Sequence, residues 1–157
     1  MLDTLLANAL NEQMNLEFLS ARIYLALGGY LDLLNLSGFA GEMKKHADEE
    51  NGHAMKFYEY LLDRQTPVEL SALEAVEGSP ENFVEAFLAA WNHEKRVTTA
   101  IEDLHTLACG LDKQTEVFLQ WFLTEQVEEE RDAERDYAVA FAASQTPGLI
   151  YLLDKEI

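Results

Sequence analysis

Six carboxylate, carboxamide and imidazole side chains recur in four separate stretches of this chain of 157 residues: Glu17, Glu50, His53, Glu94, Gln126 and Glu129. Glu50 and His53 are three positions apart, and residues at that spacing lie on the same face of a helix. Carboxylate oxygens and imidazole nitrogens are the donors that hold pairs of iron ions inside helical bundles. The spacing therefore predicts a two-metal centre assembled from several helices.

Each of these polar residues shares its helical face with apolar side chains. Glu17 lies in a seven-residue repeat with Leu10 and Leu31, so it points where two leucines point. The second stretch follows one apolar and aromatic stripe in steps of four and three: Phe39, Met43, His46, Glu50, His53, Phe57 and Tyr60. The other two stretches contain the rows Phe87, Glu94, Ile101 and Phe122, Gln126, Glu129, Ala133. We expect four helices that direct these polar groups into one interior.

Four inward acids in one bundle require positive charge among them, because an uncompensated buried carboxylate costs several kcal/mol. Bundles with two carboxylate-bridged metals use one Glu from each of two helices and a Glu-x-x-His from each of the other two. Glu17 with the pair Glu50 and His53 forms one such half. In the other half, Gln126 and Glu129 stand where Glu and His would complete the motif. We therefore predict that the two metals are bound with different affinities.

Composition restricts the class of protein and its partners. The formal net charge is -18 with only 11 Lys and Arg residues, which excludes a nucleic-acid partner and favours cations, although ordinary soluble proteins are also acidic. No apolar run is long enough to cross a membrane, and Asp3 and Asn8 interrupt the N-terminal apolar residues as a signal peptide would not. The single Cys109 precludes an internal disulfide. We expect one domain, located in the cytoplasm.

Helix start and stop signals predict five helices, at about 3–32, 37–64, 80–109, 112–144 and 147–156. The expected caps are Asp3, Ser37, Ser79 before Pro80, Asp112 and Thr146 before Pro147, with Gly110 ending the third helix. The one long connection is at 65–79, and its 14 residues from Gln65 to Gly78 can span roughly 45 Å when extended. That reaches the far end of a helix of about 28 residues, which is roughly 42 Å long. The expected fold is all-α: two antiparallel hairpins joined by a long crossover into a four-helix bundle, with a short fifth helix.

Several motifs are similar to those of one family. They are LNEQMNLE at 10–17, HADEENGH at 46–53, HE at 93–94, FLQWF at 118–122, EQVEEE at 125–130 and DKE at 154–156. With these motifs the chain resembles the bacterial non-haem ferritins along its whole length. The resemblance implies the ferritin-like bundle and a cage of 24 subunits. Such a cage has ferroxidase activity: it oxidises Fe(II) with O2 or H2O2 and deposits a ferric mineral, for iron storage and detoxification.

The resemblance also implies a role for each candidate ligand. The implied sets are Glu17, Glu50 and His53 for metal A and Glu50, Glu94 and Glu129 for metal B, with Glu50 bridging and Gln126 beside metal B. A third iron site would use Glu49, Glu125, Glu128 and Glu129. Tyr24 and Trp121 fall where the family places redox-active aromatics, although two core aromatics with satisfied polar ends would fit the pattern equally well.

Some further residues and two other classes of function have to be considered. Haem is not expected, because Asn51 stands where the haem-binding bacterioferritins have a Met. His46 shares the inward row and would lie near the metals or be an ordinary hydrogen-bonded histidine, whereas His93 is expected at the surface or at a subunit contact. A diiron oxygenase-type enzyme and a non-catalytic helical assembly protein remain alternatives.

Overall fold

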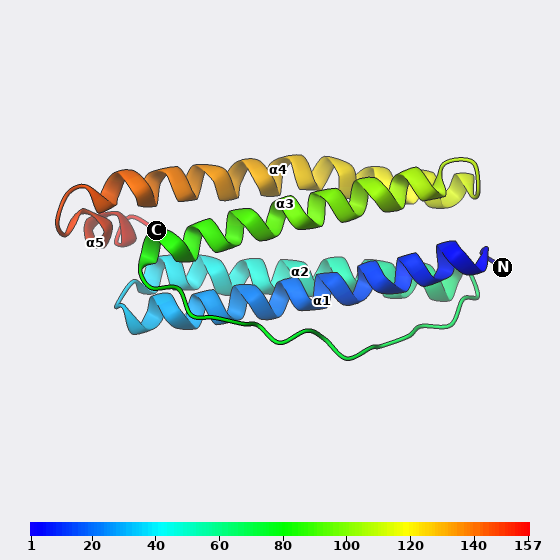
Figure 1. The fold of residues 1–157 in the computed structure, drawn as a ribbon, viewed down its shortest axis with the longest axis horizontal. Helices are drawn as coiled ribbons and strands as arrows, with labels where there is room; N and C mark the ends of the chain where they lie inside the picture. Colours follow the sequence, from blue (N-terminus) through cyan, green and yellow to red (C-terminus); the bar gives the residue numbers. More distant parts are fainter.

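The structure is a computed structural model that describes residues 1–157 and consists of helices and their connections. The helices are α1 (Thr4–Leu33), α2 (Ser37–Asp63), α3 (Phe83–Ala108), α4 (Lys113–Ser144) and α5 (Leu149–Asp154). In Figure 1, α1 and α2 form one antiparallel hairpin, α3 and α4 form another, and an extended crossover runs along the length of the first hairpin. Because of that crossover, α2 and α3 run parallel. The predicted all-α fold, a four-helix bundle with a short fifth helix, is confirmed.

The interior of the bundle is apolar towards both ends and polar in the middle. One apolar cluster includes Leu6, Leu10, Met14, Phe57, Ile101 and Phe122, and the other includes Leu27, Leu31, Leu36, Met43, Phe87 and Ile150. The predicted seven-residue repeat on α1 runs through both clusters, with Glu17 between Leu10 and Leu31. The helices are therefore held together by two apolar cores with a polar layer between them. No helix combines the length and the apolarity needed to cross a lipid bilayer.

The helix caps agree with the sequence at two of the five predicted positions. Asp3 accepts a hydrogen bond from the Leu5 amide, and Asp112 accepts one from the Thr115 amide, as an N-cap side chain does. The third long helix, by contrast, does not begin at Ser79 and Pro80. Its N-cap is Asn82, whose side chain accepts from the Glu85 amide at 3.1 Å, while the Glu85 carboxylate accepts from the Glu81 amide at 2.8 Å. These two hydrogen bonds satisfy amides at the start of the helix and outweigh the local preference for Pro80 at the first helical position.

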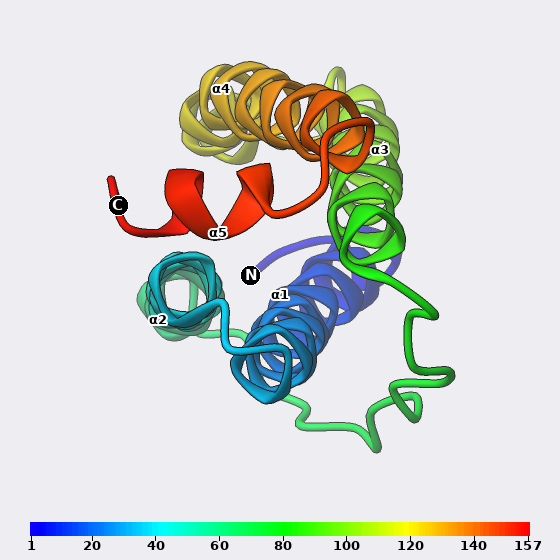
Figure 2. The ribbon, with the colours of Figure 1, turned by 90° about the vertical axis from the view of Figure 1, so that its left-hand side faces the viewer.

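The start of α2 is capped from the far end of the chain. Ser37 is not its N-cap but its first residue, and the N-cap residue Leu36 has no side-chain hydrogen bond to offer. Instead, the Asp154 carboxylate accepts a hydrogen bond from the Phe39 amide at 2.8 Å. Asp154 ends α5, which lies across the end of the bundle between α2 and α4 (Figure 2). The last helix begins at Leu149 rather than at Pro147, after Gly148 with a φ of 79°.

We expect Gly38→Ala to destabilise the protein by detaching α5 from α2. A Cβ at Gly38 would collide with the backbone carbonyl oxygen of Asp154, which cannot move without α5. The control is Gly41→Ala in the same helix, where a Cβ would meet nothing within 4 Å. Alanine there should stabilise α2 by up to about 1 kcal/mol, because glycine is a poor helix former. Thermal denaturation of both variants checks this prediction, and a higher melting temperature for Gly38→Ala would contradict it.

The crossover is fixed to α1 by two buried asparagines of the LNEQMNLE motif. The Asn11 side chain donates to the Pro67 carbonyl at 3.1 Å and accepts from the Glu69 amide at 2.7 Å. The Asn15 side chain donates to the Glu69 carbonyl at 2.8 Å and accepts from the Ser71 amide at 3.1 Å. These side chains replace the hydrogen bonds that an extended segment would otherwise make with a neighbouring strand. The first half of the crossover therefore has a defined path.

Candidate metal centre

The polar layer in the middle of the bundle contains one buried glutamate from each long helix. The exposed fractions are 1% for Glu17, 2% for Glu50, 0% for Glu94 and 9% for Glu129. No lysine or arginine lies among the buried residues of the chain, so nothing in the protein neutralises these acids as fixed positive charge. Such a layer is unfavourable unless the acids hold protons or bind cations.

The side chains predicted for metal A come together in the structure. The ligand atoms of Glu17, Glu50 and His53 all lie within 4.8 Å of one another. His53 Nδ1 is 3.0 Å from Glu50 Oε2, and Gln13 Nε2 donates a hydrogen bond to Glu17 Oε1 at 2.7 Å. The other oxygen of that carboxylate, Glu17 Oε2, is fully buried and has no hydrogen-bond partner. This unpaired oxygen beside a second carboxylate and an imidazole fits the position of a metal ion.

Of the carboxylates predicted for metal B alone, Glu94 has hydrogen-bond partners and Glu129 has none. Glu94 accepts hydrogen bonds from the Tyr24 hydroxyl and, at 3.1 Å, from Gln126 Nε2. Gln126 therefore orients a carboxylate, as a residue beside a metal site does. The Glu129 carboxylate accepts no hydrogen bond in the protein, and its ligand atoms group with those of His46 and His53 rather than with Glu94. The two halves of the layer are thus built differently, as the unequal motifs suggested.

The four carboxyl groups hold their protons more firmly than exposed glutamates do. Burial, followed by the nearby charge of Glu50, raises the pKa of Glu17 well above its ordinary value. Burial and the charges of Glu94 and Glu129 raise the pKa of Glu50 to about 9. Burial, and next the charge of Glu94, raises the pKa of Glu129 to about 8. The pKa of Glu94 is raised as well, chiefly by burial. In the metal-free protein this layer therefore carries protons at neutral pH, which cations can displace.

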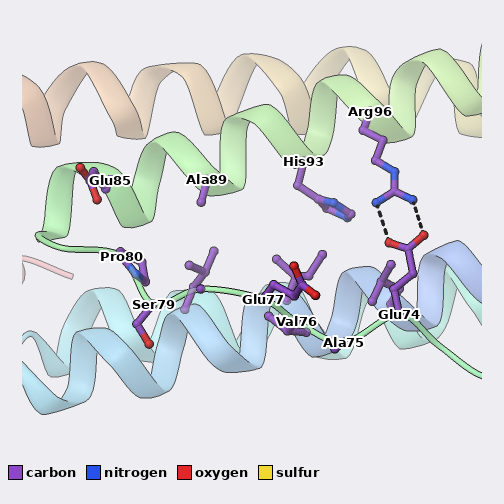
Figure 3. Close-up of a pocket in the computed structure, with 14 residues that line it drawn as sticks. Glu74, Ala75, Val76, Glu77, Ser79, Pro80, Glu85, Ala89, His93 and Arg96 are labelled. Atoms are coloured by element: carbon purple, nitrogen blue, oxygen red, sulfur yellow. Dashed lines mark hydrogen bonds and ion pairs between the residues drawn. The ribbon is translucent and has the colours of Figure 1, made fainter.

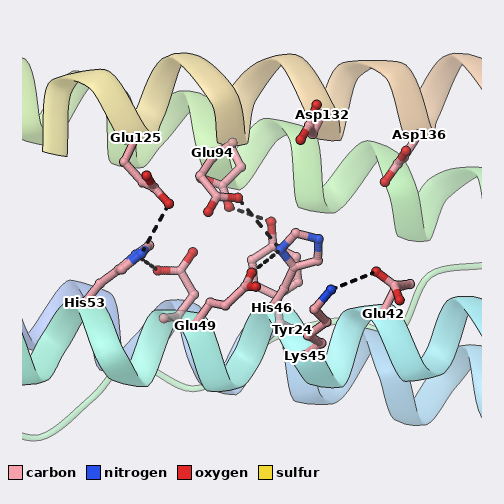
Figure 4. Close-up of polar contacts among 12 residues, drawn as sticks. Tyr24, Glu42, Lys45, His46, Glu49, His53, Glu94, Glu125, Asp132 and Asp136 are labelled. Atoms are coloured by element: carbon pink, nitrogen blue, oxygen red, sulfur yellow. Dashed lines mark hydrogen bonds and ion pairs between the residues drawn. The ribbon is translucent and has the colours of Figure 1, made fainter. Parts of the chain in front are cut away.

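Only some of the residues implied for a third site lie close to one another. Glu49 groups with His46 and Glu129, and Glu125 groups with His53 and Glu129, in each case with the ligand atoms within 4.8 Å of one another. Figure 4 shows Glu125 reaching from α4 towards His53 on α2. Glu128 is exposed on α4 and belongs to neither group. The structure adds His46, whose role the sequence left open.

Comparisons with known proteins agree with this geometry. The family profile described as a ferritin-like domain matches residues 7–135. The chain belongs to the ferritin family. It is 35% identical to the bacterial non-heme ferritins of Staphylococcus aureus and Staphylococcus epidermidis, covering 100% of this chain and 95% of theirs. The resemblance to the bacterial non-haem ferritins is thereby confirmed.

Solved ferritin structures share the fold. A structure of the open-pore ferritin from Archaeoglobus fulgidus superimposes with a TM-score of 0.94 at 34% identity, covering 98% of this chain and 94% of that one. A closed form of that ferritin, engineered by mutagenesis, gives a TM-score of 0.95 at 34% identity, with coverages of 99% and 96%. The ferritin of Chlorobium tepidum gives 0.90 at 30% identity, with coverages of 99% and 96%.

His93 is buried in this ferritin and does not lie at the surface as predicted. It is 7% exposed, and its Nε2 lies 2.7 Å from the Ser20 hydroxyl. Burial, and then the charge of Arg96, lowers its pKa to about 4, so the ring is neutral at physiological pH. Figure 3 shows His93 directed from α3 towards the crossover, beside a pocket of about 410 Å³ that the Glu74 and Arg96 ion pair borders. The prediction was wrong because the crossover, which has no helical pattern, helps to cover this face.

Trp121 lies at the edge of the polar layer. Its ring is half-exposed and meets the His53 ring edge-on, with centroids 5.4 Å apart, while the Lys56 ammonium lies over its face. Tyr24 is fully enclosed, and its hydroxyl contacts Glu94 directly. Of the two aromatics implied as redox partners, Tyr24 therefore contacts a candidate ligand by hydrogen bonding and Trp121 contacts one through its ring.

Proposed function

We propose that this ferritin stores iron by oxidising Fe(II) at a dinuclear centre of Glu17, Glu50, His53, Glu94 and Glu129 and by depositing the ferric product inside a closed cage of 24 copies. The observation that carries the proposal is the buried layer of four carboxyl groups, in which Glu17 Oε2 is left without any partner. Two dications would neutralise that layer. Iron is here the substrate and the cargo rather than a resident cofactor.

The reaction follows from the donor set. Hard carboxylate oxygens favour Fe(III) over Fe(II), so binding in this layer lowers the reduction potential of the iron. With Glu50 as the proposed bridging ligand, one carboxylate would hold both ions close enough to give one electron each to a single oxidant. O2 then takes up two electrons and two protons and leaves as H2O2, while H2O2 as the oxidant takes up the same number and leaves as two water molecules. Tyr24 keeps the Glu94 carboxylate oriented through its hydroxyl.

The size of the cavity that adjoins the proposed centre at Glu129 favours storage over an oxygenase-type reaction. The cavity lined by Tyr24, His46 and Glu129 has a volume of about 20 Å³. That is room for about one water molecule and not for an organic substrate. In a helical assembly protein without metal chemistry, four acids buried together would destabilise the fold and bring no benefit.

Anaerobic addition of two Fe(II) per subunit to the metal-free protein, followed by O2, tests the proposal. We expect fast ferric absorbance with about one O2 consumed for every two Fe(II) in the first turnover. Addition of a large excess of Fe(II) should then give electron-dense cores inside the particles. Iron that stays at two ions per subunit without any core would instead indicate a retained cofactor, and the storage proposal would be wrong.

A second prediction concerns assembly. The helices and the crossover expose many large apolar side chains, among them Leu5, Leu25, Leu33, Leu62, Leu70, Val117, Val127, Phe141 and Leu152. Monomeric soluble proteins seldom leave so much apolar surface uncovered, so we expect a closed symmetric oligomer. Light scattering at micromolar concentration should give a mass many times the 17.8 kDa of one chain. A mass of one chain would contradict the cage.

A further inference from the structure

A pocket of about 410 Å³ lies between α1, α3 and the second half of the crossover, and none of the proposed metal ligands lines it (Figure 3). Small-molecule sites in proteins have volumes of about 300–1,000 Å³. The pocket is open because the crossover stands away from the helices here. Between positions 72 and 80, the only hydrogen bonds from the crossover to a helix are the two that Arg96 donates to Glu74, at 3.3 and 3.4 Å. The crossover therefore forms one wall of the pocket without filling it.

His93 presents an unused hydrogen-bond acceptor to this pocket. The Ser20 hydroxyl donates its only proton to the Leu16 carbonyl at 3.0 Å, so it accepts a hydrogen bond from His93 Nε2 at 2.7 Å. In the neutral ring the proton is then on Nε2, and Nδ1 is an acceptor. Nδ1 has no hydrogen-bond partner in the protein and is not a fully buried atom, so it is accessible from the pocket that the ring lines. A ligand that donates a hydrogen bond can bind there to a ring that Ser20 already holds in place.

The rest of the lining combines apolar side chains with an excess of negative charge. The apolar residues are Leu19, Ile23 and Leu27 of α1, Val76 and Pro80 of the crossover, and Ala89 of α3. The charged residues are Glu74, Glu77, Glu85 and Arg96. The arginine is paired with Glu74, so the other two carboxylates have no positive partner. Because His93 is neutral, the pocket favours a positively charged ligand that has an apolar part.

We propose that this pocket binds an organic ammonium ion, namely a primary amine with a compact apolar body. The ammonium group donates a hydrogen bond to His93 Nδ1, and the apolar body packs against Leu19 and Ile23. Figure 3 shows His93 directed towards the crossover segment that carries Glu77, so an ammonium group bound to the ring faces that carboxylate. Inorganic cations have no apolar body to bury, and organic anions have no proton to donate to Nδ1 and are repelled by the glutamates. The pocket shares no residue with the dinuclear centre, so amine binding does not depend on the proposed function.

Calorimetric titration of the assembled, metal-free protein with 2-phenylethylammonium chloride tests the site. Sodium chloride at about 0.15 M screens the attraction between the amine and the acidic surface as a whole. We expect about one amine bound per subunit with a Kd of about 0.1–1 mM, which is the range for a ligand of this size. The neutral analogue 2-phenylethanol should bind at least about tenfold more weakly, and the anion 3-phenylpropionate should not bind.

Four variants locate the bound amine. His93→Leu removes the acceptor and should weaken binding by about tenfold or more, because a hydrogen bond from a charged donor is lost. Glu77→Gln removes an exposed charge and should weaken binding by about two- to fivefold. Ala89→Phe fills the pocket from an exposed position and should abolish binding, which keeps the test decisive if His93→Leu fails to fold. The matched control is Glu102→Gln, exposed on the same helix outside the pocket, which should bind as the wild type does. Circular dichroism verifies the fold of each variant.

Three results would overturn the site. The first is the absence of saturable amine binding to the wild type. The second is equal affinity for 2-phenylethylammonium and 2-phenylethanol, because the acceptor and the charge would then select nothing. The third is wild-type affinity in both His93→Leu and Ala89→Phe, which would place the bound amine outside this pocket. No iron enters these titrations, so a protein that oxidises Fe(II) and forms mineral cores but binds no amine rejects the site alone.

Discussion

Glu50→Ala is expected to abolish the fast phase of Fe(II) oxidation. Glu50 is 2% exposed and lies 3.0 Å from His53, and burial together with the charges of Glu94 and Glu129 raises its pKa, which is consistent with the proposed bridging role. Loss of groups that merely orient metal ligands costs about 10–100-fold in affinity or activity. Loss of a ligand shared by both ions should therefore lower the initial rate by more than about a hundredfold. Stopped-flow absorbance of the ferric product measures it.

The accompanying variants separate the two metals. His53→Ala should weaken metal A and Glu94→Ala should weaken metal B, so each variant should lose one of the two ions of the dinuclear centre when Co(II) is titrated. Glu59→Ala, on the exposed face of the same helix as Glu50, is the matched control and should oxidise Fe(II) at the wild-type rate. If Glu50→Ala retained the wild-type initial rate, the assignment of Glu50 as the bridging ligand would be wrong.

The inward direction of the candidate ligands could be predicted from local spacing. A helix with Leu10, Glu17 and Leu31 in one row must bury all three or none, and the structure buries them all. The same holds for Glu50 and His53 in their aromatic stripe. Helical periodicity is a property of neighbours in the sequence, so one sequence is enough to read it.

Contacts between distant segments could not be predicted in this way. The cap of α2 comes from Asp154, 115 positions after Phe39, and nothing at Ser37 signals it. The asparagines that fix the crossover, Asn11 and Asn15, lie in a motif that indicated the family resemblance but not a contact with the crossover. The position of His46 between two carboxylates likewise depends on how α2 packs against α4. Each of these is decided by tertiary packing and not by a repeat.

The metal-free protein is expected to lose stability as the pH rises from about 5 to 9. The ordinary pKa of Glu50 and Glu129 is 4.5, and the fold raises these values to about 9 and about 8. A carboxyl group with a raised pKa in the folded state binds its proton more tightly there than in the unfolded chain. Its stabilising contribution is therefore complete below the ordinary pKa and is lost as the pH rises through the folded value. Asp112 behaves in the opposite way, because hydrogen bonds from Arg64 lower its pKa, so its contribution is lost as the pH falls below its ordinary pKa of 3.8.

Glu50→Gln removes one of these charges while keeping the shape of the side chain, and it should reverse much of the trend. At pH 9 the metal-free variant should melt at least about 5 °C above the wild type, since each kcal/mol shifts the melting temperature of a chain of this size by roughly 2–4 °C. Well below the ordinary pKa of 4.5 the two proteins should melt alike, because Glu50 is then neutral in both the folded and the unfolded state. Calorimetry across this range measures the difference, with Glu59→Gln as the exposed control.

Addition of two Co(II) per subunit to the wild type should release protons at pH 7, because the cations replace the protons on the buried carboxylates. The melting temperature of the wild type should then depend less on pH. A melting temperature of the metal-free wild type that rises between pH 6 and 9 would show that these acids are neutralised by something other than protons or metal ions.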